Sequence, residues 1–152
     1  MVDLNSLPDP RQAELRDSIE RLFFAYRAFT DRADRILERR GLSRVHHRIL
    51  YFVGRHPGVS VKGLLAILEV SKQAINAPLR QLLEMKLVSM EVGQTDRRVK
   101  ALALTEDGRK LEAELTGAQM RFLEGAFDTA GAEAETGWVR VMEAMGQGAF
   151  SG

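Results

Sequence analysis

The sequence contains no cysteine and no long apolar run. Without cysteine, the chain can form no disulfide bond, no thiolate metal site and no thiol redox switch. A membrane-spanning helix needs roughly 20 consecutive apolar residues, and no stretch approaches that length. The N-terminal stretch carries Asp3 and Asp9 and does not resemble a signal peptide. These absences favour a cytoplasmic protein with no membrane partner.

Motifs for catalysis are absent as well. The chain has no G-x-S-x-G nucleophile turn, no H-E-x-x-H zinc helix and no glycine-rich phosphate loop. Its three histidines, His46, His47 and His56, lack the spacing of structural zinc ligands. We therefore expect no enzymatic activity, no metal and no cofactor.

The net charge is only +1, but the charges are unevenly distributed. Residues 35–110 hold 15 Lys and Arg against 7 Asp and Glu, whereas residues 1–34 hold 5 against 7 and residues 111–152 hold 2 against 7. A basic middle between acidic ends is expected when only the middle faces a polyanion. Taken alone, the pattern also fits a chance clustering of solvated surface charges.

The N-terminal region predicts one long helix that starts near Pro8 and Pro10 and ends at Gly41. Its apolar residues alternate four and three apart, as in a heptad repeat. This stripe consists of Leu15, Ile19, Leu22, Tyr26, Phe29, Ala33 and Ile36. A helix of about 30 residues is ~45 Å long, too long to pack along one small domain. Part of the stripe should therefore contact a second chain, and we expect a homodimer.

Three serines, Ser43, Ser60 and Ser71, each precede an amphipathic segment and are predicted to cap a helix. Two strands with alternating apolar residues follow the third of these helices. Thr105 is predicted to cap the last helical region, where glycines favour a bend or break near residues 129–131.

The order helix, tight turn, helix and hairpin predicts a winged helix-turn-helix. The fold class is mainly α, with a small antiparallel wing of two or three strands. The second helix of such a pair enters the major groove, where Asn and Gln can pair with adenine and Arg with guanine. The candidate base and backbone contacts on this helix are Ser71, Lys72, Gln73, Asn76, Ala77 and Arg80. The alternative reading of the same residues is a solvated polar helix face.

The tip of the hairpin carries two adjacent arginines beside a glycine turn. Arginine is attracted to the negative potential of a narrow minor groove, so the tip is expected to touch DNA. The candidate wing contacts are Thr95, Asp96, Arg97, Arg98 and Lys100. A winged helix that serves only to bind other proteins would not require Asn76, Arg80 and the two arginines on its DNA-facing surfaces.

Residues 59–111, VSVKGLLAILEVSKQAINAPLRQLLEMKLVSMEVGQTDRRVKALALTEDGRKL, resemble the DNA-binding core of the MarR (multiple antibiotic resistance regulator) family. The strongest match is Asp96-Arg97-Arg98, followed by Leu104-Thr105 and Gly108-Arg109. The resemblance, which covers about residues 12–125, implies a homodimeric repressor or activator bound to double-stranded operator DNA. It also implies dimerisation helices in residues 1–40 and 105–152, which flank a DNA-binding lobe in residues 41–104.

The chain departs from the family pattern at several positions. The family favours a small residue at the position of Leu65 and glycine at those of Glu69 and Lys86, so the turn before the recognition helix is expected to be less tight. The wing tip reads Gly93-Gln94-Thr95 and lacks one common arginine. In such wings the aspartate often supports an arginine, which suggests a structural role for Asp96.

The resemblance also implies a small ligand, often an aromatic acid, bound between the dimerisation helices and the lobe. Candidate lining residues for such an aromatic or amphipathic effector are Tyr26, His46, His47 and Tyr51. Consecutive histidines point about 100° apart on a helix and cannot both face one small site, and each could equally serve only in packing.

Pro78 is the least expected residue of the recognition helix, because it removes the hydrogen bond to the Ala74 carbonyl. The apolar spacing continues in register on both sides of it. We therefore expect this helix to persist through Pro78 but to bend there.

Overall fold

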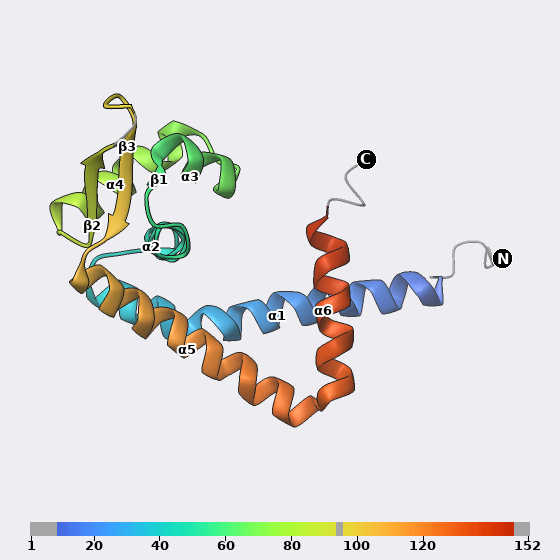
Figure 1. Cartoon of the computed structure of the whole chain (residues 1–152). Helices are drawn as coiled ribbons and strands as arrows, with labels where there is room; N and C mark the ends of the chain where they lie inside the picture. The colour runs from blue at the N-terminus through green and yellow to red at the C-terminus, as the bar shows by residue number, and fades with distance from the viewer. Residues whose placement is uncertain (1–8, 94–95, 148–152) are drawn as a thin grey trace.

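The computed structural model describes residues 9–93 and 96–147. Within these residues a winged lobe sits at one end of a longer helical framework (Figure 1). The framework consists of α1 (Pro10–Arg39), α5 (Glu106–Ala130) and α6 (Ala132–Gly146). The lobe consists of α2 (Arg44–Arg55), β1 (Val59–Ser60), α3 (Val61–Leu68), α4 (Lys72–Glu84), β2 (Val88–Val92) and β3 (Lys100–Leu104). The predicted mainly α winged helix fold is confirmed. No helix in the described part of the chain is long and apolar enough to span a bilayer.

Helices α3 and α4 begin where the sequence predicts, because their capping side chains satisfy free backbone N–H groups. The Ser60 hydroxyl accepts from the Gly63 N–H at 2.9 Å. Ser71 accepts from the Ala74 N–H at 3.3 Å. These short polar contacts fix the entry of the chain into α3 and α4.

The sheet is antiparallel with strand order β1-β3-β2, so the last strand in sequence lies in the middle. Met90 lies opposite Leu102, and Val59 pairs with Leu102 on the other side. One face of this sheet and the inward faces of α2, α3 and α4 enclose a single core. Its fully buried side chains include Ile49, Leu50, Val53, Leu64, Ile75, Leu82, Leu87 and Leu102.

The lobe joins the framework through a close contact at the start of α5. The Thr105 N–H donates to the Leu87 carbonyl at 3.1 Å, and the Thr105 hydroxyl donates to the Lys86 carbonyl at 2.7 Å. A Cβ atom at Gly108 would lie 1.9 Å from the Leu87 carbonyl oxygen. Only glycine allows the two backbones to approach this closely, which gives Gly108 of the family motif a physical reason.

In the framework, α1 and α5 pack together near the lobe and then diverge, and α6 turns back across α1 in the view of Figure 1. Gly131, at φ +100°, separates α5 from α6, so the expected break near residues 129–131 is confirmed. Ala33 and Leu37 of α1 are buried, but Ile19 is 67% exposed and Leu22 is 48% exposed. Within the single chain, the outer half of the apolar stripe is therefore uncovered.

Two of the departures from the family pattern fall on strained backbone. Among the described residues, Glu69 at φ +53° and Lys86 at φ +59° are the non-glycine residues with positive φ. At both positions the family that the sequence resembles favours glycine. Glu69 adopts the left-handed conformation and its N–H donates to the Leu65 carbonyl. The turn between α3 and α4 thus keeps the left-handed backbone of a glycine turn and carries the strain at Glu69. That the turn is less tight stays a prediction.

Helix α4 runs without interruption through Pro78, so the predicted persistence of the helix is confirmed. The inward residues Ile75, Leu79 and Leu82 are buried on both sides of the proline. Their packing offsets the hydrogen bond that the proline ring removes. The bend at Pro78 stays a prediction.

Candidate nucleic-acid interface and ligand crevice

The outer face of α4 presents the side chains predicted to contact DNA. Gln73, Asn76 and Arg80 are exposed, and they lie opposite the buried stripe of this helix. Lys72 and Ala77 are exposed on the same helix, and Ser71, its N-cap, is also exposed. The helix therefore offers amide, guanidinium and ammonium donors on a surface that packing leaves free.

The two arginines of the wing differ in their hydrogen-bond and ion-pair partners. The Asp96 carboxylate accepts from the Arg98 N–H at 3.0 Å, from Arg98 Nε at 3.2 Å and from Arg98 Nη2 at 3.2 Å. These side-chain and backbone hydrogen bonds hold the pKa of Asp96 below its usual value. Within residues 9–93 and 96–147, Arg97 takes part in no ion pair. The expected supporting role of Asp96 is thus directed at Arg98, and Arg97 is exposed, with no ion pair to another described residue.

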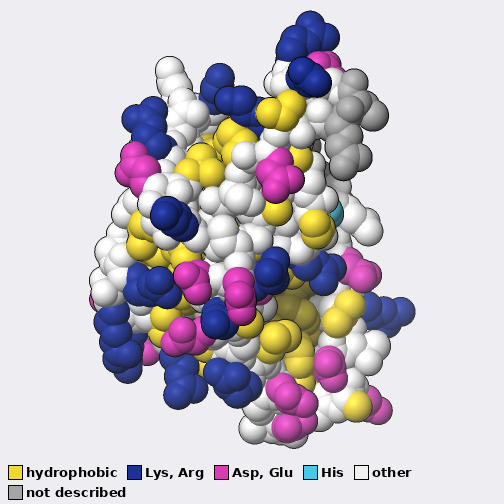
Figure 2. All heavy atoms as spheres, turned by 60° about the vertical axis from the view of Figure 1, so that its left-hand side comes forward, with side chains coloured by type: hydrophobic (Ala, Val, Ile, Leu, Met, Phe, Trp, Pro, Cys, Tyr) yellow, Lys and Arg dark blue, Asp and Glu magenta, His cyan; other side chains and the backbone are white. Residues whose placement is uncertain are grey.

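The base of the wing is closed by backbone contacts. The Gly93 N–H donates to the Val99 carbonyl at 2.6 Å, and a Cβ at Gly93 would lie 2.7 Å from the Asp96 carbonyl oxygen. Lys100, the first residue of β3, is exposed. Thr95, also a candidate wing contact, lies outside the described residues. Figure 2 shows Lys and Arg side chains over the upper part of this face, which the lobe and wing occupy, and also over its lower part, where Asp and Glu side chains lie among them.

A crevice of about 350 Å³ lies between α1, α2 and α5. It brings together Tyr26, His47 and Tyr51, three of the four side chains predicted to line a ligand site. Further aromatic and apolar walls come from Phe29, Phe52, Met120 and Leu123, and polar groups come from Thr30, Asp34, Arg44, Arg48, Thr116 and Gln119. The crevice therefore combines apolar walls with a charged end, which is the usual make-up of a small-molecule site.

His46 does not belong to this crevice, so its assignment to the ligand site is corrected. Its Nδ1 accepts from the Ser43 N–H at 2.9 Å, which leaves Nε2 as the protonated nitrogen that donates to Gln81 Oε1 at 2.9 Å. Gln81 Nε2 in turn donates to the Gly41 carbonyl at 3.3 Å. His46 caps α2 and ties it to α4, and adjacent residues on a helix cannot both point into one small site.

His47 is buried in the crevice wall as a neutral imidazole. Thr116 donates its hydroxyl proton to Glu112 Oε1 at 2.8 Å, so its oxygen accepts from His47 Nε2 at 3.3 Å. Burial lowers the pKa of His47, against the opposing effects of Glu112 and Asp34, and the charge of Arg48 lowers it further. This side chain contributes polarity to the crevice without adding charge at neutral pH.

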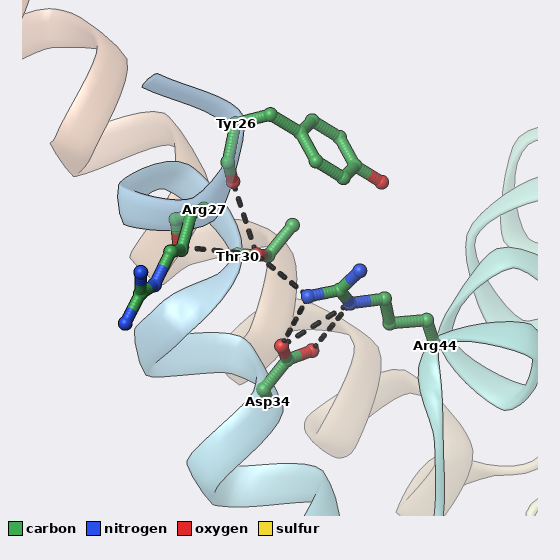
Figure 3. A network of polar contacts seen from close by, with 5 residues as sticks. All are labelled: Tyr26, Arg27, Thr30, Asp34 and Arg44. Atoms are coloured by element: carbon green, nitrogen blue, oxygen red, sulfur yellow. Dashed lines mark hydrogen bonds and ion pairs between the residues drawn. The ribbon is translucent and has the colours of Figure 1, made fainter. Parts of the chain in front are cut away.

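Arg44, the first residue of α2, reaches across to α1 (Figure 3). Its Nε lies 3.1 Å from both Asp34 oxygens, and its Nη2 lies 2.8 Å from Asp34 Oδ2 and 3.1 Å from Thr30 Oγ1. Its guanidinium carbon lies 5.5 Å from the centre of the Tyr26 ring. The hydrogen bond with Asp34 raises the pKa of Arg44. One side chain thus connects the lobe, the framework and the crevice.

Sequence reasoning did not identify the charged groups of the crevice. The four-residue spacing of Arg44 and Arg48 on α2 was a usable signal, because such residues share one helix face. No local signal pairs Asp34 with Arg44, since the chain turns between α1 and α2 before the two meet. Thr116 was equally hidden, because only the packing of α5 against α2 places it beside His47.

The lobe and its two exposed surfaces define the class of the protein, a winged helix-turn-helix DNA-binding protein. A sequence model of the MarR family matches residues 40–99. The HTH-type transcriptional regulator PetP of Rhodobacter capsulatus is 45% identical over 132 residues, which cover 87% of this chain and 80% of that protein. The chain belongs to the MarR family and is a transcriptional regulator of that type.

Solved structures agree on the fold. The crystal structure of MarR matches with a TM-score of 0.68 at 19% identity, over 98% of this chain and 95% of that one. The Mycobacterium tuberculosis MarR family protein Rv2887 in complex with p-aminosalicylic acid matches with a TM-score of 0.59 at 21% identity, over 82% of this chain and 95% of that one. The winged lobe and the helical framework are therefore both features of this fold.

Proposed function

We propose that this regulator is a homodimer that binds an inverted-repeat operator in double-stranded DNA and that a small aromatic or amphipathic ligand tunes the binding. The observation that carries the proposal is the lobe itself, which exposes a polar helix face and the wing arginine Arg97 together. In this proposal residues 41–104 bind DNA, and residues 1–40 and 105–152 form the dimer.

The two DNA-facing surfaces have different roles. Gln73, Asn76 and Arg80 of α4 enter the major groove and read base edges by hydrogen bonding. Arg97 enters the minor groove, where the narrow groove concentrates negative potential. Arg98, held by Asp96, contacts the phosphate backbone in a fixed orientation. The affinity thus comes mainly from charge, and the sequence preference comes mainly from α4.

Dimerisation is supported by the uncovered apolar surface of the framework. A groove of about 480 Å³ between α1, α5 and α6 is lined almost entirely by apolar side chains, among them Leu22, Phe127, Trp138 and Met142. It continues into the exposed stripe of α1. A second copy of the framework would cover both surfaces and place two lobes about one helical turn of DNA apart, ~34–36 Å.

Ligand control is supported by the position of the crevice between framework and lobe. Its walls come from α1 and α5 of the framework on one side and α2 of the lobe on the other, so a bound molecule would touch both the framework and the lobe. A ligand that fits one spacing of the lobes better than another shifts the population toward that spacing. The Rv2887 complex with p-aminosalicylic acid makes an aromatic acid a reasonable first class to test.

The test starts from selection of bound fragments from genomic DNA, followed by gel shifts at several salt concentrations. Arg97→Ala should weaken binding and lower the slope of its salt dependence by about one counterion, because one positive charge leaves the interface, and it should not lower the melting temperature. Asn76→Ala and Arg80→Ala should relax the sequence preference by about 1–3 kcal/mol. Lys110→Ala, an exposed charge on α5, serves as the control. Normal binding by all three lobe variants would contradict the proposed interface.

A further inference from the structure

Gln81 is half-buried on the flank of α4 and connects this helix to two other parts of the chain. Its Oε1 accepts from His46 Nε2 of α2 at 2.9 Å, and its Nε2 donates at 3.3 Å to the carbonyl of Gly41, in the turn after α1. Within residues 9–93 and 96–147, no other side chain of α4 hydrogen-bonds to a different element. The polar contacts of α4 with its neighbours are therefore concentrated in one residue.

His46 is fixed in turn by the N-terminus of α2. Its Nδ1 accepts from the Ser43 N–H at 2.9 Å, so its Nε2 carries the proton that Gln81 accepts. The Gln81 amide then satisfies both partners in only one orientation, with its oxygen toward His46 and its nitrogen toward the Gly41 carbonyl. The three groups therefore hold one another in a single arrangement.

The other contacts of α4 with the lobe are apolar. Ile75, Leu79 and Leu82 are buried in the core of the lobe. Apolar burial is non-directional, whereas a hydrogen bond weakens steeply when its angle falls below ~120°. The two hydrogen bonds of Gln81 therefore constrain the rotation of α4 about its axis more sharply than the apolar contacts do, and this rotation sets the direction of the outer face.

The position of Gln81 along α4 decides which DNA-facing residue it constrains most. Gln81 follows Arg80 directly, whereas Asn76 lies on the other side of Pro78. Pro78 has no N–H to donate to the carbonyl four residues earlier, so one backbone hydrogen bond between the two halves of α4 is missing. The half of α4 that carries Arg80 is thus the half that Gln81 holds.

We propose that Gln81 and His46 are positioning residues for DNA recognition, which orient Arg80 toward its base pair although neither belongs to the exposed face of α4. The inference rests on the proposed binding of α4 in the major groove and adds two residues that set the sequence preference from outside the interface. A bidentate contact of arginine with guanine depends on direction. A small rotation of α4 therefore reduces discrimination at that base pair more than it reduces the total affinity, which comes mainly from phosphate contacts.

The measurement is a ratio of dissociation constants of the full-length protein for the selected operator and for two altered operators. One altered operator changes the base pair whose preference Arg80→Ala removes, and the other changes the base pair whose preference Asn76→Ala removes. Each ratio is independent of the folded fraction, because the same sample binds both DNAs. The wild type should discriminate about tenfold or more at each position.

Gln81→Met keeps the length of the side chain and removes both hydrogen bonds. It should reduce discrimination at the Arg80 position by about threefold or more, because the helix loses its directional contacts. It should change discrimination at the Asn76 position by less than about twofold, because Pro78 separates that residue from the constraint.

Two substitutions of His46 separate helix capping from positioning. His46→Asn keeps an acceptor for the Ser43 N–H, since Oδ1 takes the place of Nδ1, but its side chain is too short to reach Gln81. It should reduce discrimination as Gln81→Met does. His46→Gln can still donate to Gln81 but has no acceptor for the Ser43 N–H, so it should lower the melting temperature and keep the wild-type ratios.

His56→Asn, at the exposed histidine that ends α2, is the matched control and should change neither ratio. The double variant of His46→Asn and Gln81→Met should discriminate no worse than either single variant, because both remove the same link.

Unchanged discrimination in Gln81→Met or in His46→Asn, or equal losses at the two operator positions, would overturn the assignment. If Gln81→Met does not fold, the two His46 variants decide. Failure of the wild type to bind DNA, or an Arg80→Ala variant that loses no preference at any position, would instead overturn the proposed function.

Discussion

The winged lobe and the helical framework contain similar apolar side chains, but the lobe buries them and the outer framework leaves them exposed. In the lobe, Leu64, Leu82 and Leu102 are completely buried within one chain. In the framework, the outer part of α1 and the whole described length of α6 contain no buried residue. The lobe has a core of its own, whereas the outer framework leaves an apolar surface exposed within one chain, as protein–protein interaction sites do.

The largest expected effect comes from breaking the junction of lobe and framework. Gly108→Ala would place a methyl group 1.9 Å from the Leu87 carbonyl oxygen, so β2 and α5 must separate. We expect a loss of about 3 kcal/mol or more in the free energy of unfolding, measured by urea denaturation. Gly125→Ala in the same helix has nothing within 4 Å and should be neutral or stabilising. Equal effects of the two variants would contradict the close contact.

The next largest effect distinguishes the framework from the lobe, because it concerns dimer formation and not the folding of the lobe. Ile19→Asp places a charge in the exposed stripe of α1, and burying it in a dimer would be strongly unfavourable. We expect sedimentation at micromolar protein to change from about twice 17.0 kDa to 17.0 kDa, while the lobe stays folded. Arg32→Gln, an exposed polar position of α1, should remain dimeric. A wild type that sediments as a monomer would refute the dimer and the palindromic operator with it.

A smaller effect concerns pH and the contact between α2 and α5. Burial lowers the pKa of His47 in the folded state, so the unfolded state binds the proton more tightly. The stability that depends on a neutral His47 is fully present above pH 6.5, the ordinary pKa of histidine. It is lost as the pH falls through the lowered pKa of the folded state. The slope for one group cannot exceed about 1.4 kcal/mol per pH unit. His47→Gln should flatten the stability profile between pH 7 and 5, whereas His56→Gln, at an exposed position, should not.

The smallest effect lies within the lobe, at its strained turns. Lys86→Gly removes the steric cost of φ +59°, but it also gives the unfolded chain more freedom. We expect a net stabilisation below about 1 kcal/mol, measured by thermal unfolding. Ala66→Gly in the interior of α3 should instead destabilise the lobe by about 1 kcal/mol. A destabilising Lys86→Gly would show that the lysine side chain contributes a contact that outweighs the strain.

Sequence alone determined the order of elements, the starts of the helices and the two exposed surfaces that are proposed to face DNA. Serine and threonine caps, apolar periodicity and the Asp96-Arg97-Arg98 wing tip act over a few residues, so their consequences follow from local geometry. The same reasoning identified the break at Gly131 and the persistence of α4 through Pro78. It also predicted that part of the α1 stripe lies outside the core of one chain.

Only the tertiary structure decided which of two adjacent histidines faces the crevice and where Asp34 finds its partner. His46 and His47 are equivalent in sequence, but the packing of α2 between α4 and α5 directs one to Gln81 and the other to Thr116. Such pairings depend on how separate elements are oriented against each other. A local sequence pattern fixes the face of each helix but not the neighbour that the face meets.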